Sequence, residues 1–339
     1  MGAPGRRARA RRRDWRPGAG PATVAPLSIR GSAHLSTSAS PSTPNDWLST
    51  VLGANRAERP ALAWSFLYFF ALLCGYYVLR PIRDALGTEY ELRWLFLGTF
   101  TCMLLAVPLY GALVSRFPRR RFLPLIYGFF VACLVGFYLL LRADAGGNLR
   151  GAAFFIWVAV FNLFAVSVFW SFMSDIFSTE QAKRLYGSIA AGGTVGALLG
   201  PTLTVSLVKI VGVPNMLLIS IGFLALCLLS ITRLVPWAAA QEKRLGWKPG
   251  EDAIGGSIIG GATLILRSRF LQAACLLMFF GVAVGTLLYN QQQAYAAATF
   301  PDRAARAAFF GRIDLAVNIV VLVVQLTVTR FLLRRYGPG

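Results

Sequence analysis

Long apolar runs dominate the sequence from residue 61 onward, and they decide what such a chain can fold into. The hydrocarbon core of a bilayer is crossed by about 20 apolar residues of helix, since a helix satisfies its backbone hydrogen bonds within its own segment. Eight runs have this length, at about 61–82, 92–114, 122–141, 152–175, 186–209, 214–236, 269–293 and 312–333. We therefore predict an all-α, polytopic membrane protein.

The composition agrees with a membrane protein. Charged residues make up 14% of the chain, against about 25% in a soluble domain. The net charge of +20 is misleading, because seven arginines crowd into residues 6–16. Outside that segment no basic stripe alternates with aromatic residues, so we expect no nucleic-acid partner. The expected partners are the lipid bilayer and a small-molecule substrate, and the oligomeric state stays open.

The sequence argues against an enzyme. The single histidine, His34, lies in the N-terminal segment, which leaves no histidine for catalysis or metal binding among the apolar runs. Asp84, Asp175 and Asp314 lie on separate helices with no motif that pairs them. There is no phosphate-binding Gly-x-x-x-x-Gly-Lys-[Ser/Thr] loop. The cysteines are widely spaced inside apolar runs, at positions 74, 102, 133, 227 and 275. We expect no catalytic residue, no metal and no cofactor.

The chain divides into four parts. Residues 1–59 are a predicted disordered basic tail, although their arginine-rich and acid-poor composition also suits an organelle transit peptide. Residues 60–236 form a predicted six-helix bundle, 237–268 a charged cytoplasmic link, and 269–339 a second bundle with two helices. Because a six-plus-six transporter has twelve helices, we expect a C-terminally truncated chain, unstable and inactive by itself.

Lysine and arginine favour a cytoplasmic N-terminus in a cell (inner) membrane. With that orientation, 17 basic residues between Arg56 and Arg335 fall on the inside and 9 on the outside, not counting the distal tail. Cytoplasmic loops carry the excess of basic residues in membrane proteins.

Two segments resemble the major facilitator superfamily. Gly111 through Arg121, which includes Arg116 and Arg120, is similar to that family's loop motif between the second and third helices, with Ser115 and Pro118 at two altered positions. The run Gly196-x-x-x-Gly200-Pro201 is similar to an element of facilitator antiporters, and it equally fits a small-residue packing face. The resemblance implies a facilitator bundle in which these residues serve helix packing and gating.

The end of the first helix carries charge into the apolar region. Arg80 and Arg83 are three residues apart and share a helical face with Tyr76 and Tyr77. Arginines at membrane depth usually face a cavity, and a guanidinium binds phosphate with two donors. The alternative is that both arginines mark the helix end and extend to the interface.

A second segment runs from Phe169-Trp170 to Lys183-Arg184-Leu-Tyr186. Together with residues 76–84 it resembles the nucleotide (ATP/ADP) translocases of plastids and intracellular bacteria. That family has lysine where this chain has Arg83, and an acidic residue where it has Gln181. The resemblance implies substrate binding by Arg80, Arg83, Tyr76 and Tyr77, with Lys183 and Arg184 at the cytoplasmic mouth.

The predicted function is secondary transport by alternating access, as an antiporter that exchanges nucleotides or another phosphorylated anion. The alternatives are a facilitator for an unrelated small solute or a transport-inactive membrane fragment. Asp314, Asn318 and Gln325 form one polar stripe on the last helix, either for hydrogen bonds between helices or for a water-filled path.

Overall fold

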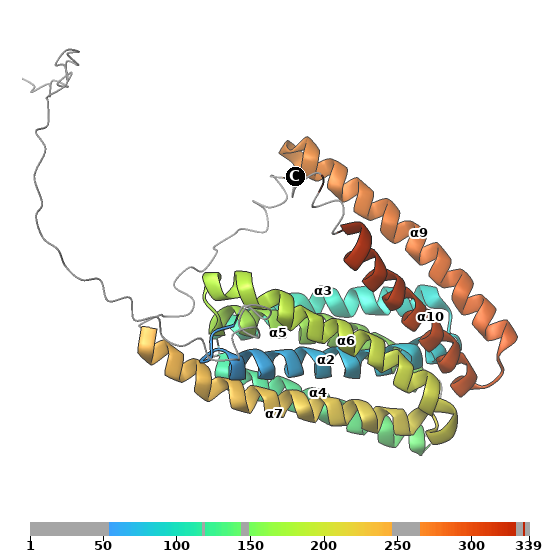
Figure 1. Ribbon diagram of the computed structural model, residues 1–339. Helices are drawn as coiled ribbons and strands as arrows, with labels where there is room; N and C mark the ends of the chain where they lie inside the picture. The colour runs from blue at the N-terminus through green and yellow to red at the C-terminus, as the bar shows by residue number, and fades with distance from the viewer. Residues whose placement is uncertain (1–53, 117–118, 144–148, 246–264, 330–334, 336–339) are drawn as a thin grey trace, which may run out of the picture. The chain divides into compact units, whose positions relative to one another are not determined.

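The computed structural model describes residues 54–116, 119–143, 149–245, 265–329 and 335. Within them lie eight long helices (Figure 1): α2 (Arg59–Gly87), α3 (Leu92–Arg116), α4 (Arg119–Arg142), α5 (Leu149–Ile176), α6 (Thr179–Val211), α7 (Val213–Leu245), α9 (Arg269–Thr299) and α10 (Arg303–Val324). A short π-helical turn, Gln325–Thr329, continues α10. The prediction of an all-α polytopic bundle is confirmed, and the eight helices match the eight apolar runs.

Several helix boundaries differ from the predicted ones, and three of them bear on the site. α6 begins at Thr179 because Ser178 and Gln181 form a capping box, so Lys183 and Arg184 lie in its first turns. α10 begins at Arg303 because the Asp302 carboxylate accepts the Ala305 N–H. α2 continues through Pro81 to Gly87, so Arg80 and Arg83 lie inside the helix.

The edges of the predicted parts also shift within the described residues. Ala54 and Glu58, at the end of the predicted tail, are buried against the bundle. α7 continues to Leu245, which places residues 237–245 of the predicted link in a helix.

α2 lies at the centre of the helices and packs chiefly against α6 and α7. Figure 1 shows it running between them. Its apolar core includes Leu72, Val78 and Ile82, which are completely buried. A hydrogen bond also joins α7 to the backbone of α2, because Ser220 Oγ donates to the Gly75 carbonyl at 2.8 Å.

Small residues allow α6 to approach α2 closely. A Cβ on Gly200 would lie 2.6 Å from Tyr77 Cβ and 2.8 Å from the Cys74 carbonyl oxygen. A Cβ on Gly196 would collide with the Phe70 carbonyl oxygen. Glycine at these two positions therefore sets the distance between two parallel helices.

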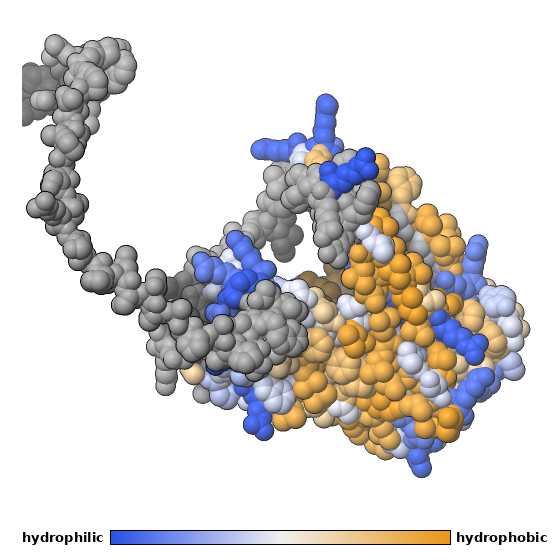
Figure 2. Space-filling model, viewed as in Figure 1, coloured by the Kyte–Doolittle hydropathy of each residue, from blue (hydrophilic) through white to orange (hydrophobic). Residues whose placement is uncertain are grey.

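The described helices present an apolar surface. Each of the eight is long and apolar enough to span a membrane. Figure 2 shows the apolar surface over the helices and hydrophilic side chains gathered at helix ends. A surface of this kind suits lipid rather than water as its surroundings.

Candidate substrate site

The central feature of the candidate site is a four-charge cluster between α2 and α10, formed by Arg80, Arg83, Asp84 and Asp314. Arg83 donates to Asp84 Oδ1 through Nε at 2.9 Å and through NH2 at 2.6 Å. Arg80 NH1 lies 3.4 Å from Asp314 Oδ1 of α10. Two guanidinium groups and two carboxylates leave the cluster without net charge.

Aromatic rings border the cluster. The Arg83 guanidinium lies over the Phe155 ring of α5 at 4.9 Å, and the Arg80 guanidinium lies 5.7 Å from the Tyr77 ring centroid. Tyr76 meets Tyr77 edge-on at 5.2 Å. One face of the Tyr77 ring is thus already engaged by a cation.

A tyrosine of α9 ties the cluster to the second part of the chain. The Tyr289 hydroxyl donates to Asp84 Oδ1 at 2.8 Å, and Gln293 Nε2 donates to the Tyr289 oxygen at 2.8 Å. Asp84 therefore accepts three hydrogen bonds, which hold it next to Arg83.

Two cavities follow one another along α9 on either side of this tie. The cavity farther from the ends of α2 and α9, called the deeper cavity below, has a volume of about 290 Å³. Residues of α2, α3, α5 and α9 line it, including Arg83, Phe96, Thr99, Phe155 and Tyr289. The second, about 500 Å³, lies beyond Gln293 at the ends of α2 and α9. The deeper cavity is slightly below the lower end of the ~300–1,000 Å³ range of ligand pockets. Its volume suits a phosphate-sized group better than a whole nucleotide.

The end of α2 that carries these charges is bonded to α10. Arg303 pairs with Glu89 at 2.5 Å, and Arg306 NH1 donates to Thr88 Oγ1 at 2.9 Å. Both arginines lie in the first turn of α10 and join it to the turn after α2.

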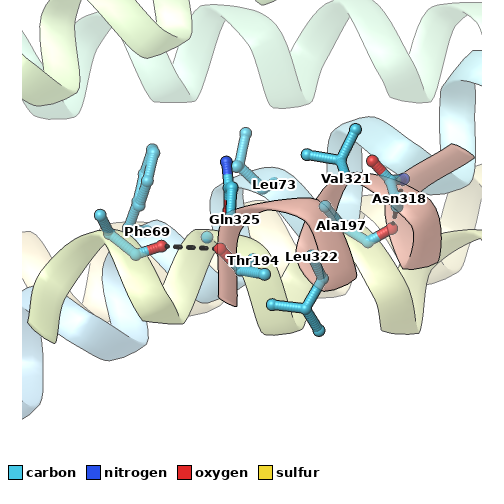
Figure 3. A pocket seen from close by; sticks show the side chains of 10 residues that line it. Phe69, Leu73, Thr194, Ala197, Asn318, Val321, Leu322 and Gln325 are labelled. Carbon is cyan, nitrogen blue, oxygen red and sulfur yellow. Dashed lines mark hydrogen bonds between the residues drawn. The ribbon is translucent and has the colours of Figure 1, made fainter. Parts of the chain in front are cut away.

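A third cavity of about 180 Å³ lies between α2, α6 and α10 (Figure 3). Pro201 has no N–H, so the Ala197 carbonyl lacks its helical donor. Asn318 Nδ2 of α10 supplies one at 2.9 Å, as the dashed line shows. Of the polar stripe on α10, Asn318 thus bonds between helices, whereas Gln325 lines the cavity.

Lys183 and Arg184 belong to α6 and lie beside the start of α2, whereas Arg80 and Arg83 lie near the end of α2. The helices run parallel, and Arg184 NH2 pairs with Glu58 Oε1 at 3.2 Å, just before α2 begins. At 1.5 Å per helical residue, the separation from Arg83 is on the order of 35 Å. The structure therefore does not bring these two basic residues into the arginine cluster.

Glu58 is a buried carboxylate that the sequence analysis placed in the tail. Its partners are the Asn55 N–H at 3.0 Å, Gln181 Nε2 at 2.8 Å and Arg184. Burial alone raises the pKa of Glu58, but these hydrogen bonds and the Arg184 charge together lower it below its ordinary value.

The side chains of Gly111, Arg116 and Arg120 lie outside the described part of the chain. Their backbone belongs to the end of α3 and the start of α4. Among the described residues, no group of three metal-ligating side chains occurs.

The roles of Asp84 and Asp314 as counter-ions were not assigned from the sequence. A usable signal was present, because carboxylates at membrane depth are rare and usually pair with neighbouring cations. Two arginines and two aspartates in the apolar runs therefore suggest pairs. Which aspartate meets which arginine depends on the crossing of α2 and α10.

These features define a polytopic helical membrane protein with charged groups held between its helices. The chain belongs to the Major Facilitator Superfamily, whose family model matches residues 42–339. It is thus a secondary transporter of the major facilitator type. Neither a curated protein nor a solved structure matches the chain significantly.

Proposed function

We propose that this transporter carries a phosphorylated small anion, with adenine nucleotides as the first candidates, by exchange across a cell (inner) membrane. The observation that carries the proposal is Arg83, a guanidinium inside a membrane-spanning helix that lines a cavity between four helices. Arg83 already pairs with Asp84. Charged side chains inside a helix bundle usually mark a substrate or ion pathway, and a guanidinium binds phosphate with two donors.

The second support is the surroundings of that guanidinium. The deeper cavity contains the Thr99 hydroxyl, whose oxygen is buried without a hydrogen-bond partner among the described residues. It also contains the aromatic rings of Phe96 and Phe155. A phosphate at Arg83 would meet a second donor there. A base or sugar would extend toward the larger cavity beyond Tyr289.

The proposed arrangement in the membrane has α2–α7 as one bundle, and α9 and α10 as part of a second. The N-terminus lies on the cytoplasmic side, so the Arg303–Glu89 pair faces outward. Lys183 and Arg184 then lie at the cytoplasmic end, where they add positive charge to the mouth as well as fixing topology.

The proposal is tested by uptake of labelled ATP, ADP, AMP and phosphate into liposomes that contain the purified, full-length protein. We expect uptake by the parent, loss of uptake in Arg83→Ala, and partial uptake in Arg83→Lys, which keeps the charge but not the forked donors. Arg142→Ala is the matched control, because Arg142 is exposed at the end of α4 and lines neither cavity.

Two results would count against the proposal in different ways. Uptake by Arg83→Ala equal to that of the parent would remove Arg83 from the site. No uptake of any of the four anions by the parent would remove the substrate class and leave a facilitator for another solute, or a chain without transport activity.

A further inference from the structure

The charge balance of the cluster limits what it can bind. Arg80, Arg83, Asp84 and Asp314 sum to zero, and each arginine already has a carboxylate partner. An anion that enters next to Arg83 therefore adds an uncompensated negative charge where the dielectric constant is low. Such a charge is costly unless a carboxylate is neutralised at the same time.

The two carboxylates are held very differently. Asp84 Oδ1 accepts from Arg83 twice and from Tyr289. Asp314 has one ion pair, at 3.4 Å, and its Oδ2 is buried with no hydrogen-bond partner in the described residues. The Asp314 side chain is only 8% exposed, whereas that of Arg80 is 35% exposed. Asp314 is thus the carboxylate that loses least when it is protonated.

We propose that Asp314 is a proton-binding site, and that one proton binds there for each anion that the arginine cluster binds. The proton converts the Asp314 carboxylate to a carboxylic acid. Arg80 is then left with no anionic partner, and the cluster gains a net charge of +1. The inference rests on the proposed anion binding and extends it to cotransport of a proton with the anion.

The groups around Asp314 support a local exchange of charge. The charges that act on it are Arg80, Asp84 and Arg83, all from α2. On α6, the neighbours of Gly311, one turn earlier in α10, are Pro201, Thr204 and Val205, none of which titrates. On α9, the Tyr289 hydroxyl donates a hydrogen bond to Asp84. On α7, the Arg233 guanidinium lies over the Trp64 ring, near the start of α2. Within the described chain, Arg80 is thus the direct partner of Asp314.

Linkage makes the proposal quantitative. If protonation of Asp314 raises anion affinity, anion binding raises the proton affinity of Asp314 by the same factor. With obligatory coupling of one proton, anion affinity falls about tenfold for each pH unit above the range in which Asp314 is protonated.

The test is proton uptake by the purified, full-length protein in weakly buffered detergent solution when ADP or inorganic phosphate is added, followed with a pH dye. Binding of the labelled anion is measured in the same samples, between about pH 5.5 and pH 8. We expect about one proton taken up per anion bound. Asp314→Asn should take up about one proton fewer per anion than the parent and keep only the pH dependence of the phosphate's own ionisation at about pH 6, because the amide resembles the neutral acid. Glu180→Gln, which changes an exposed carboxylate in the first turn of α6, outside the cavities, should behave as the parent.

The outcomes separate the two proposals. An anion bound without proton uptake, or uptake unchanged in Asp314→Asn, overturns the proton site and leaves anion binding in place. Binding that responds to sodium rather than to protons also overturns it. No binding of either anion by the parent overturns both proposals. A folding defect in Asp314→Asn is recognised by its elution volume, and Asp314→Glu, which keeps a titratable group, should then restore proton uptake.

Discussion

The bond between Asn318 and the Ala197 carbonyl gives a prediction that can be worked through from the structure. The Ala197 carbonyl has no donor within α6, because Pro201 has no N–H. Asn318 Nδ2 donates to this carbonyl instead, at 2.9 Å. Asn318→Leu removes the donor while keeping the number and branching of the side-chain heavy atoms. The carbonyl is then left without a donor.

The expected cost is about 1–2 kcal/mol. Hydrogen bonds between membrane helices contribute about 0.6 kcal/mol on average and up to ~1.7, and a stranded buried acceptor costs ~1–3 kcal/mol. Pro201→Ala restores an N–H that bonds to the Ala197 carbonyl along the helix. In that background we expect Asn318→Leu to cost no more than about 0.5 kcal/mol, so the coupling energy is about 1 kcal/mol.

The assay is reversible unfolding in mixed micelles for the parent, the two single variants and the double variant. Asn290→Leu is the matched control, because Asn290 Nδ2 donates to Thr286 O of its own helix. Its cost should not depend on residue 201. A coupling energy below about 0.3 kcal/mol between residues 201 and 318 would refute the reasoning, since neighbours that share a bond should not be additive.

Three further predictions follow from the fold. Gly200→Ala should destabilise the protein by about 1–3 kcal/mol in the same assay, because its Cβ meets the α2 backbone, whereas Gly222→Ala, with nothing within 4 Å, should not. Because the pKa of Glu58 is lowered in the folded protein, the ionised carboxylate stabilises the fold at pH values above the ordinary pKa of glutamate. This stabilisation is lost as the pH falls through the lowered pKa. Thermal melts of Glu58→Gln should therefore lack that loss of stability at acidic pH. A membrane-impermeant thiol reagent should label Arg93→Cys from outside intact cells, and Lys183→Cys only after permeabilisation; labelling of both from one side would contradict the topology.

The length of the apolar runs determined much of the fold in advance. The eight spans follow from the thickness of a bilayer, which a sequence reveals directly. The predicted starts of α6 and α10 are too late, because a polar first turn precedes the apolar part of each helix. These turns follow the caps Ser178 and Asp302. A hydropathy pattern does not detect a cap that is followed by charged residues.

The site was only partly predictable. Arg80 and Arg83 are visible in the sequence as charges at the end of an apolar run. The pairing of Arg80 with Asp314 is not, because it depends on how α10 crosses α2. Glu58 was missed because it follows a long basic segment, and its burial depends on Gln181 and Arg184, more than 120 residues later.

The central claim is that Arg83 recognises the phosphate of an anionic substrate, and equilibrium binding of ADP and adenosine tests it most directly. ADP and adenosine share the base and sugar, so the difference in their affinities measures the phosphate contribution. For the parent we expect ADP to bind at least about 30-fold more tightly, equivalent to ~2 kcal/mol for a buried charged hydrogen bond. In Arg83→Ala that difference should nearly disappear, and in Arg142→Ala it should remain. Equal affinities for ADP and adenosine in the parent, or an unchanged difference in Arg83→Ala, would contradict the account.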